Sequence, residues 1–423
     1  MIEMKDSGIE WIGKIPAHWE VKRLKDISIL GSGTTPKSSN EKYYDGTHPW
    51  LITGDVQNRL IEHNENFITD LALADIPSLK LYPAKTVLLA MYGGGTIGNV
   101  GLMTYPAYIN QACCAMIPKS NIFEKYLFYY LRTKYSRIIS TGVGGTQINL
   151  SQNKIAAYPV AVPPIEEQKA IADYLDKKTT EIDEQITGYE KKRDAYQRLK
   201  CSLISEVITR GLNPTTELKD SGIEHIGKIP THWSVERFKT FARTIKGKAY
   251  DTLEDPSENA LKILSVECLR QDEIQFYDYI DAVDDSQICT TNDVVVIWDG
   301  AGVGEFLRAK EGVLSSTIAK IQLTNKMVLM PYLWYWRYMI EYTLKSMPTG
   351  MGIPHLNPNI LNNYKIAIPP IEEQQAIADY LDKKTAEIEG NISAINKKID
   401  AYKRLKQSLI DEVVTGKRRI EKA

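Results

Sequence analysis

The sequence predicts an α+β protein in which two similar domains, related by a pseudo-twofold axis, are joined by two long helices that form an antiparallel coiled coil. Three observations support this architecture. The chain has 423 residues, more than one ordinary domain needs; two blocks recur in the same order; and each copy ends in a heptad pattern. The segments that we expect are 1–162 (first domain), 163–216 (first helix and linker), 217–368 (second domain) and 369–423 (second helix).

The first repeated block opens each half of the chain. Residues 5–19 read KDSGIEWIGKIPAHW and residues 219–233 read KDSGIEHIGKIPTHW, so 13 of 15 positions match. A second block follows each domain: PPIEEQKAIADYLDKKTTEI at 163–182 and PPIEEQQAIADYLDKKTAEI at 369–388 match at 18 of 20 positions. The residues between the blocks have diverged. The sequence therefore predicts one frame, used twice, around two different inserts.

Both inserts share a skeleton of short apolar runs and glycines. TVLLAMY at 86–92 precedes glycines at 93–98, and DVVVIW at 293–298 precedes glycines at 300–304, as in a buried strand closed by a glycine turn. An aromatic-rich helical pattern follows in each half, then a T-G-x-G loop and a short strand; these lie at 122–136, 141–149 and 157–162, and at 331–346, 349–357 and 365–368. Each insert is expected to form its own α+β core.

A long helix is expected after each Pro-Pro pair. Pro164 and Pro370 suit a first helical turn, and the glutamates after them complement the helix dipole. A seven-residue apolar repeat predicts a coiled-coil seam at Leu175, Ile182, Tyr189, Tyr196 and Leu203, and at Leu381, Ile388, Ile395, Tyr402 and Leu409. Companion residues should widen the stripe: Ile171, Ile186, Leu199, Val207, Ile377, Ile392, Leu405 and Val413. Each rod should be about 65–70 Å long. The alternative is that each helix packs on its own domain.

Composition and motifs indicate a protein that binds rather than reacts. The formal net charge is −1, which argues against a simple cationic surface for DNA or an anionic membrane. The five cysteines include no Cys-x-x-Cys pair, so we expect neither disulfides nor a metal site. No apolar run could span a bilayer, so we expect a cytoplasmic protein that does not bind a membrane. Glycines 93, 95 and 98 match a dinucleotide fingerprint, but no amphipathic helix follows them. No catalytic residue is predicted; His18 and His232 are expected to serve turns or packing.

The arrangement resembles the specificity subunit of type I restriction–modification systems. The resemblance is carried by the repeated opening block, the segment WLITGD at 50–55, the T-G-x-G loop and the P-P-I-E-E-Q helix start. It implies that each insert is a target recognition domain reading one half of a bipartite site in double-stranded DNA. It further implies that the helices dock two methyltransferase (modification) subunits and, through them, restriction/translocase subunits. S-adenosylmethionine, ATP and Mg would belong to those partners, and this chain would bind no cofactor and act as a non-catalytic subunit.

Candidate DNA-contacting residues are polar, cationic or aromatic side chains and glycines in loops that could enter a groove. They are Thr34, Thr35, Lys37, Ser38, Tyr92, Gly94, Thr96, Thr146, Gln147 and Asn149 in the first half, and Lys246, Lys248, Tyr250, Trp298, His355 and Asn357 in the second. The turns that begin at Tyr92 and Trp298 are included as a whole, over 92–96 and 298–302. Each could instead merely connect elements. The aromatic residues at 332–338 could stack on bases, but their helical spacing favours core packing.

Two other functions are compatible with the sequence. One is the specificity component of a system in which methyltransferase and nuclease are fused. The other is a coiled-coil adaptor with two modules that bind peptides or glycans instead of DNA. Because no segment is strongly basic, we expect the chain alone to bind DNA weakly and with strong salt sensitivity.

Overall fold

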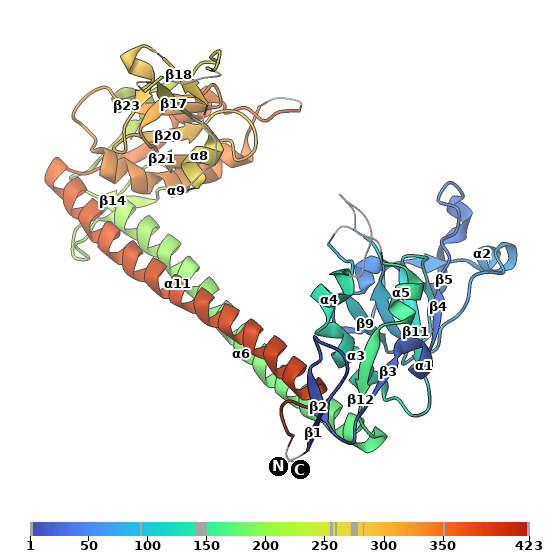
Figure 1. Ribbon diagram of the computed structural model, residues 1–423. Helices are drawn as coiled ribbons and strands as arrows, with labels where there is room; N and C mark the ends of the chain where they lie inside the picture. Colours follow the sequence, from blue (N-terminus) through green and yellow to red (C-terminus); the bar gives the residue numbers. More distant parts are fainter. Residues whose placement is uncertain are drawn as a thin grey trace. The chain divides into compact units, whose positions relative to one another are not determined.

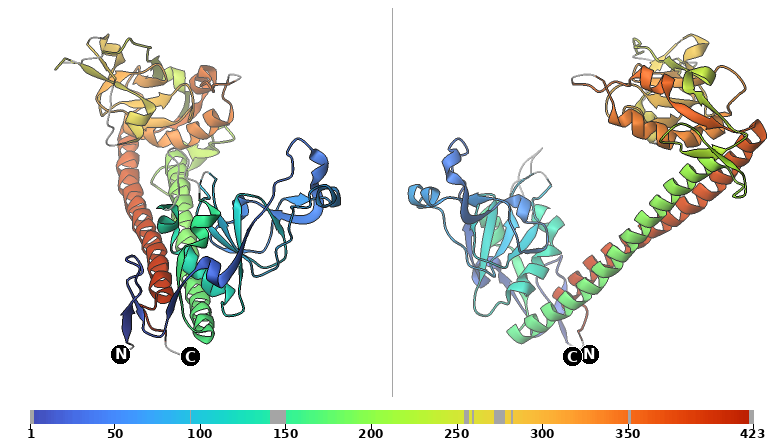
Figure 2. Two further views of the ribbon diagram at one scale, coloured as in Figure 1. Left: turned by 45° about the vertical axis from the view of Figure 1, so that its right-hand side comes forward. Right: turned by 180° about the vertical axis from the view of Figure 1, so that it is seen from behind.

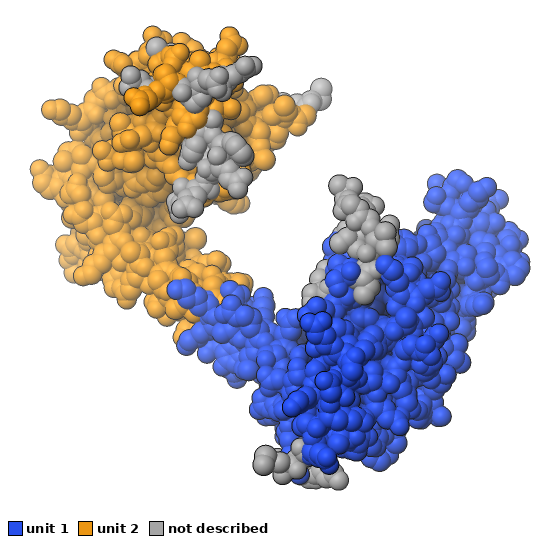
Figure 3. Space-filling model, viewed as in Figure 1, with its two compact units in different colours: residues 1–190, 397–423 blue, residues 191–396 orange. Residues whose placement is uncertain are grey.

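The computed structural model describes residues 3–93, 95–140, 150–253, 257–258, 260–271, 278–281, 283–349 and 352–420 (Figure 1). The chain divides into two units, Met1–Glu190 with Lys397–Ala423, and Lys191–Asn396 (Figure 3). Each unit holds one α+β domain and a part of both long helices. No helix in these ranges is long and apolar enough to cross a membrane.

The first domain is built on a five-stranded mixed sheet. Its order is β4 (Ser28–Ser32), β11 (Cys113–Pro118), β8 (Val87–Ala90), β9 (Val100–Met103) and β6 (Leu60–Ile61), with only the β9–β6 pair parallel. The remaining strands are β10 (Tyr108–Ile109), β5 (Tyr44–Leu51) and β7 (Phe67–Ile68), with the pairs β1 (Met4–Asp6)–β2 (Lys14–Pro16) and β3 (Glu20–Arg23)–β12 (Pro159–Val162). The helices are α1 (Leu24–Ile27), η1 (Glu41–Tyr43), η2 (Thr53–Asp55), α2 (Asp70–Asp75), α3 (Glu124–Arg132), α4 (Tyr135–Ser140) and α5 (Gln152–Ala156).

The second domain repeats this plan with two four-stranded sheets in place of the five- and three-stranded sheets. One sheet has the order β16 (Ala242–Lys246), β23 (Ile318–Leu323), β20 (Val294–Ile297) and β21 (Phe306–Arg308). The others are β18 (Tyr279–Ile280), β17 (Leu261–Leu264), β22 (Gly312–Leu314) and β19 (Ile288–Cys289), with the pairs β13 (Leu218–Asp220)–β14 (Lys228–Pro230) and β15 (Ser234–Arg237)–β24 (Lys365–Ile368). The helices are α7 (Phe238–Phe241), α8 (Val266–Arg270), η3 (Asp285–Gln287), α9 (Met330–Ser346) and α10 (Pro358–Asn363).

The predicted buried strand and glycine turn are confirmed in both domains. All four residues of β8 and of β20 are buried. Gly93 and Gly300, which follow these strands, have φ of 122° and 91°, backbone conformations that a side chain would strain. The turns close alike, because Gly98 N donates to Ala90 O and Gly304 N donates to Ile297 O, each at 2.8 Å.

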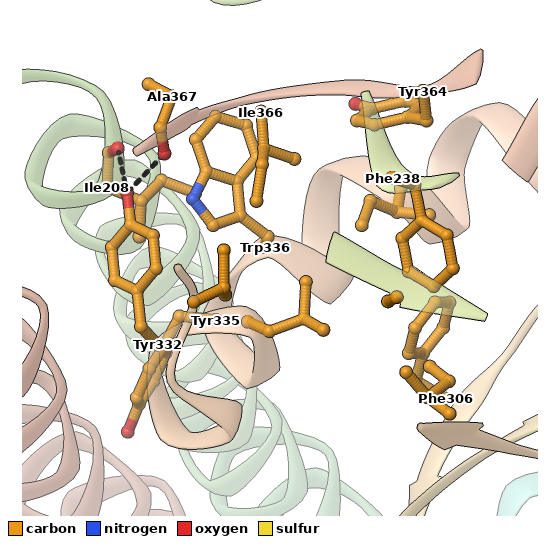
Figure 4. Packing of buried hydrophobic residues seen from close by; sticks show 14 of the residues in the cluster. Ile208, Phe238, Phe306, Tyr332, Tyr335, Trp336, Tyr364, Ile366 and Ala367 are labelled. Carbon is orange, nitrogen blue, oxygen red and sulfur yellow. Dashed lines mark hydrogen bonds between the residues drawn. The ribbon is translucent and has the colours of Figure 1, made fainter. Parts of the chain in front are cut away.

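The aromatic helix of the second domain lies in its core, as the helical spacing predicted. Tyr332, Tyr335 and Trp336 are buried (Figure 4). Trp334 and Tyr338 are partly buried and pack against the same cluster. The hydroxyl of Tyr332 donates to the carbonyls of Ala367 at 2.8 Å and Ile208 at 3.2 Å, which satisfies this buried polar group (Figure 4). These aromatic rings therefore anchor the domain on the long helix.

In the first domain the helix expected over 122–136 is interrupted. α3 ends at Arg132 and α4 begins at Tyr135. Between them, the largely buried Lys134 pairs with Asp411 of the second long helix. The corresponding residue of the second domain is Ile340, which lies on the uninterrupted helix α9 and is buried in the hydrophobic core of the domain. The first domain thus has an ion pair, with a buried lysine, where the second domain has an apolar contact.

The long helices α6 (Ile165–Arg210) and α11 (Ile371–Val414) pack antiparallel (Figures 1 and 2). Asp183 and Lys406 pair at 2.5 Å in the first unit, and Lys200 and Glu389 pair at 2.5 Å in the second. The predicted seam is confirmed: Leu175, Ile182, Leu381, Ile388, Ile395 and Leu409 are buried, and Tyr189, Tyr196, Leu203 and Tyr402 are half-buried. The ring centroids of Tyr189 and Tyr402 are 5.6 Å apart.

Two of the companion positions were predicted wrongly. Leu199 is 52% exposed and Leu405 is 50% exposed. Both lie three residues after a seam tyrosine, whereas Ile186 and Val207, four residues after their seam partners, are buried. The heptad gave the central line of the contact but not the flank on which it widens.

The repeated blocks make the same contacts in each unit. The fully buried amide of Gln168 accepts from Phe123 N at 2.8 Å and donates to Pro163 O at 2.8 Å and Asn121 O at 3.1 Å. Gln374 does the same with Leu329 N at 2.8 Å, and with Pro369 O and Met327 O, both at 2.9 Å. The glutamine of P-P-I-E-E-Q therefore fastens each helix start to the loop that precedes α3 or α9.

The two repeated histidines join the opening block to the helix start, which agrees with the predicted packing role. Nε2 of His18 lies 2.8 Å from Oε2 of Glu167, and Nε2 of His232 lies 2.6 Å from Oε1 of Glu373. In the second unit Trp233 Nε1 also donates to Glu373, at 2.9 Å. These residues hold the domain on its helix.

Candidate nucleic-acid interface

The loop after β4 presents the first group of candidate residues. Gly33 is required here, because an added Cβ would lie 1.8 Å from Ile109 O. Thr34 is tied down, since its N–H donates to Ile109 O at 3.0 Å and its hydroxyl to Ser78 O at 3.2 Å. Thr35 bonds Gln111, while Lys37 and Ser38 are exposed. The loop thus has a fixed base and an exposed cationic tip.

The glycine turn after β8 brings together residues from two segments. Thr96 N donates to Gly93 O at 3.3 Å. A Cβ on Gly93 would lie 2.6 Å from Oγ1 of Thr96 and 3.4 Å from Oγ1 of Thr53, so both threonines border the turn. Tyr92 begins the turn, and burial raises the pKa of its hydroxyl. We did not predict Thr53 as a site residue, although it belongs to the segment at 50–55.

Several first-domain candidates cannot be placed. Gly94, Thr146, Gln147 and Asn149 lie outside the described residues. The residue that follows them, Leu150, donates its N–H to Met91 O at 2.9 Å, and Leu356 donates to Trp298 O at 2.8 Å. Because these two bonds are equivalent, Leu150 corresponds to Leu356 and Ser151 corresponds to Asn357. The shared T-G-x-G letters had instead paired Asn357 with Asn149, two positions earlier.

In the second domain three candidates from distant segments meet at one carboxylate. Asp299 directly follows Trp298 after β20; its Oδ2 lies 2.8 Å from Nζ of Lys246 and its Oδ1 lies 2.6 Å from Nδ1 of His355. The Lys246 ammonium also lies 5.8 Å from the centre of the Trp298 ring. Asp299 lies within the predicted turn at 298–302, although its pairing with Lys246 and His355 was not predicted.

The electrostatics of this cluster favour a charged Asp299. Burial alone would raise the pKa of the carboxyl group, but hydrogen bonds from His355 and Lys246 outweigh burial and lower the pKa below its usual value. The carboxylate therefore orients a cation and an imidazole side by side at the end of β20. Such a pair of donors suits recognition of base edges or phosphates.

The other second-domain candidates lie apart from this carboxylate. Lys248 pairs with Asp284 at 3.3 Å, and the Tyr250 hydroxyl donates to Gln287 Oε1 at 3.3 Å. The side-chain oxygen of Asn357 accepts from Asn359 N at 3.0 Å and caps α10, as Ser151 caps α5. Asn357 thus has a local structural role that accounts for its presence.

The heptad residues cannot themselves be partner contacts where they are buried. Leu175 and Leu381 have no exposed surface, because they form the seam between the helices. A protein that docks on the helices must touch their outer faces. Lys178 and Lys384 lie there, in pairs with Glu181 at 2.7 Å and Glu387 at 3.0 Å.

Among the described residues there is no cluster of His, Cys, Asp and Glu suited to a metal ion. Burial raises the pKa of the Cys114 and Cys289 thiols to about 12, so neither is a thiolate at neutral pH.

The sequence and the fold of this chain are similar to those of known proteins. The family model for the type I restriction modification DNA specificity domain matches twice, at residues 16–188 and 230–399. The MjaIX specificity subunit of Methanocaldococcus jannaschii is 26% identical over 97% of this chain and 96% of that protein. The MjaVIII specificity subunit of the same organism is 34% identical over 44% of this chain and 43% of that protein. A solved chain from a study of complex assembly and conformational transition of the type I R-M system has the same fold, with a TM-score of 0.71 and 16% identity over 95% of this chain and 98% of that one.

Two DNA specificity domains carried on two antiparallel helices define a recognition protein with two reading domains. The chain belongs to the type I restriction–modification DNA specificity family. Within it, the chain is the non-catalytic specificity subunit.

Proposed function

We propose that each domain reads one half of a bipartite site in double-stranded DNA, the first domain spanning residues 1–162 and the second 217–368. The observation that carries this proposal is the contrast between frame and loops. Gln168 and Gln374 make the same three hydrogen bonds. By contrast, the turn after β8 presents Tyr92 and Thr96, and the turn after β20 presents Asp299 with Lys246 and His355. Different side chains on one scaffold predict two different half-sites.

Within this proposal the polar loop residues have separate tasks. The Lys246 ammonium and the His355 imidazole, both held by Asp299, contact the second half-site. Thr34, Thr35, Lys37, Ser38, Tyr92 and Thr96, with Gly94, Thr146, Gln147 and Asn149, contact the first half-site. Lys248 and Tyr250 flank the second reading surface, and Asn357 supports it through α10.

The helices 163–216 and 369–423 are proposed to dock two methyltransferase subunits, through which restriction/translocase subunits join. Two partners are expected because the sequence at the two helix starts is nearly the same: residues 163–182 and 369–388 match at 18 of 20 positions. Each helix start would therefore present a similar docking surface. S-adenosylmethionine would be bound by the methyltransferase subunits, and ATP and Mg by the restriction subunits, in the cytoplasm. This chain would contribute sequence recognition alone.

The test is to express the chain with its methyltransferase partner and to map adenine methylation over the host genome. A split motif with a spacer of fixed length is expected. Replacing residues 20–160 by the insert of another specificity subunit should change one half of the motif and preserve the other. The control is the same exchange in the second domain, which should change the opposite half. If either exchange altered both halves together, independent reading would be refuted.

A further inference from the structure

A cavity of about 510 Å³ lies in the first unit, between the end of α3 and the long helices. Its lining includes Asn58, Asn99, Arg132, Asp183, Lys403 and Lys406. The two asparagines join at the rim, because Asn58 Nδ2 donates to Asn99 Oδ1 at 2.9 Å. Asn99 directly follows the glycine turn that holds Thr96, so the cavity adjoins the first candidate DNA loop.

The cavity carries a positive charge that its own residues do not neutralise. Lys406 pairs with Asp183 at 2.5 Å. Among the described residues no carboxylate lies within ion-pair distance of Arg132 or Lys403. Burial lowers the pKa of the Arg132 guanidinium, and nearby Tyr129 and Asp183 offset this only in part. Three cations therefore face one carboxylate, an arrangement that favours an anionic ligand.

The second unit shows what the same place looks like when its charges balance. Tyr126 and Tyr332 make the same bond, to Ala161 O and Ala367 O, so Arg132, six residues on, corresponds to Tyr338. The offset between the helix-start blocks likewise makes Gln197 the equivalent of Lys403 in the other half of the chain.

The remaining groups of the second unit form closed pairs. Lys200 pairs with Glu389 at 2.5 Å and lies 5.6 Å from the centre of the Tyr338 ring. Where the first unit has Asn58 and Asn99, the second has an ion pair between Arg270 and Glu305. These two cations are matched by two carboxylates. At this position, therefore, the residues compared have an excess of positive charge in the first unit and none in the second.

We propose that the cavity of the first unit binds a phosphate group, supplied by the DNA backbone beside the first half-site. Arg132 offers the planar guanidinium that pairs with two phosphate oxygens, Lys403 a second charge, and the Asn58–Asn99 pair amide donors at the rim. The choice of DNA as the source rests on the proposed function; the affinity for phosphate does not. The site contributes affinity rather than sequence information, because a phosphate is common to all bases.

The experiment gives the first unit the residues of the second. Arg132→Tyr with Lys403→Gln is compared with wild type in the complex with its methyltransferase partner. Affinity for DNA containing the methylated motif is measured at several salt concentrations. Losing one phosphate contact should lower the slope of log affinity against log salt by about 0.9 and leave the methylation motif unchanged. Lys403→Gln alone, on the exposed rim, guards against misfolding and should give part of the effect.

A matched control removes the same charge elsewhere. Lys25→Gln with Arg404→Gln changes two exposed cations of the first unit that do not line the cavity, and its slope should stay closer to wild type. A second arm uses inorganic phosphate against sodium chloride at equal ionic strength and follows the melting temperature. Phosphate should stabilise wild type and the control more than the cavity variant.

The outcomes separate the possibilities. A reduced slope supports DNA as the source of the phosphate. An unchanged slope with protection by inorganic phosphate retains the anion site and overturns its use for DNA. If the slope is unchanged and inorganic phosphate gives no protection, the inference is overturned. If the wild-type complex itself showed no sequence-dependent binding, the proposed function would fail, whereas the inorganic phosphate arm would still decide the site.

Discussion

The two units of this protein fix their frames with the same residues and differ in the loops that follow their buried strands β8 and β20. Both fix a helix start with a buried glutamine and both anchor a tyrosine hydroxyl on backbone carbonyls. At the loop after the central strand, however, the first unit presents threonines and a tyrosine, and the second presents an aspartate that holds a lysine and a histidine. The comparison separates the residues that maintain the fold from those free to set specificity.

The largest effect should come from the shared glutamines. Gln168→Met and Gln374→Met keep the side-chain length but leave one N–H and two carbonyls without a partner in each unit. Each change should lower the free energy of unfolding by about 2–4 kcal/mol, seen as a lower midpoint in urea. The control is Gln375→Met, whose side chain is exposed and which should have little effect. Strongly unequal effects at 168 and 374 would show that the two frames are not equivalent.

The next effect should be confined to one unit. Asp299→Asn removes the charge that orients Lys246 and His355, so discrimination in one half-site should fall by about 1–3 kcal/mol per affected base pair while the other half-site stays intact. Methylation mapping would report a degenerate position in that half alone. Loss of both halves would mean that Asp299 maintains the fold.

The same carboxylate predicts a pH dependence. Because its pKa is lowered from the usual 3.8, the folded protein gains stability from ionised Asp299 above that value and loses it as pH falls through the lowered pKa. Acid unfolding followed by circular dichroism should therefore show a component below pH 3.8 that Asp299→Asn lacks. An identical acid profile in the variant would contradict the assigned hydrogen bonds.

A smaller effect is expected from the anchoring tyrosines. Tyr126→Phe and Tyr332→Phe each remove one hydroxyl bonded to two carbonyls, at the ends of different long helices. Each should cost about 1 kcal/mol, measured by urea unfolding. Tyr342→Phe, at an 80% exposed site, serves as the control. A cost in only one unit would break the equivalence of the two anchors.

The smallest effect should come from the helix–helix ion pairs. Lys200→Glu and Lys406→Glu each set two acidic side chains against each other and should cost about 0.2–1 kcal/mol. Adding Glu389→Lys to the first change, or Asp183→Lys to the second, should recover most of the loss in a double-mutant cycle. No recovery in either cycle would show that these contacts do not contribute to helix pairing.

Features written as repeats or periodic patterns were predictable from the sequence. The duplicated frame, the buried strands before Gly93 and Gly300, and the heptad seam all follow from local patterns that the fold preserves. The ion pair at the interruption was not predictable, because Lys134 and its partner Asp411 are 277 residues apart. The Asn58–Asn99 pair and the partners of Asp299 were missed for the same reason, since tertiary structure alone brings these residues together.

The glutamine clamps also bear on how new specificities arise. At Gln168 and Gln374 the helix grips each domain through main-chain N–H and C=O groups, which every insert carries whatever its side chains. A gene segment recombined between the opening block and the P-P-I-E-E-Q codons would supply the main-chain partners of these glutamines, whereas contacts such as those of Tyr126 and Lys134 depend on its side chains. If each domain reads one half-site as proposed, two such frames in one chain would allow either half of the target to be exchanged independently, and the number of targets would grow as the product of the available inserts.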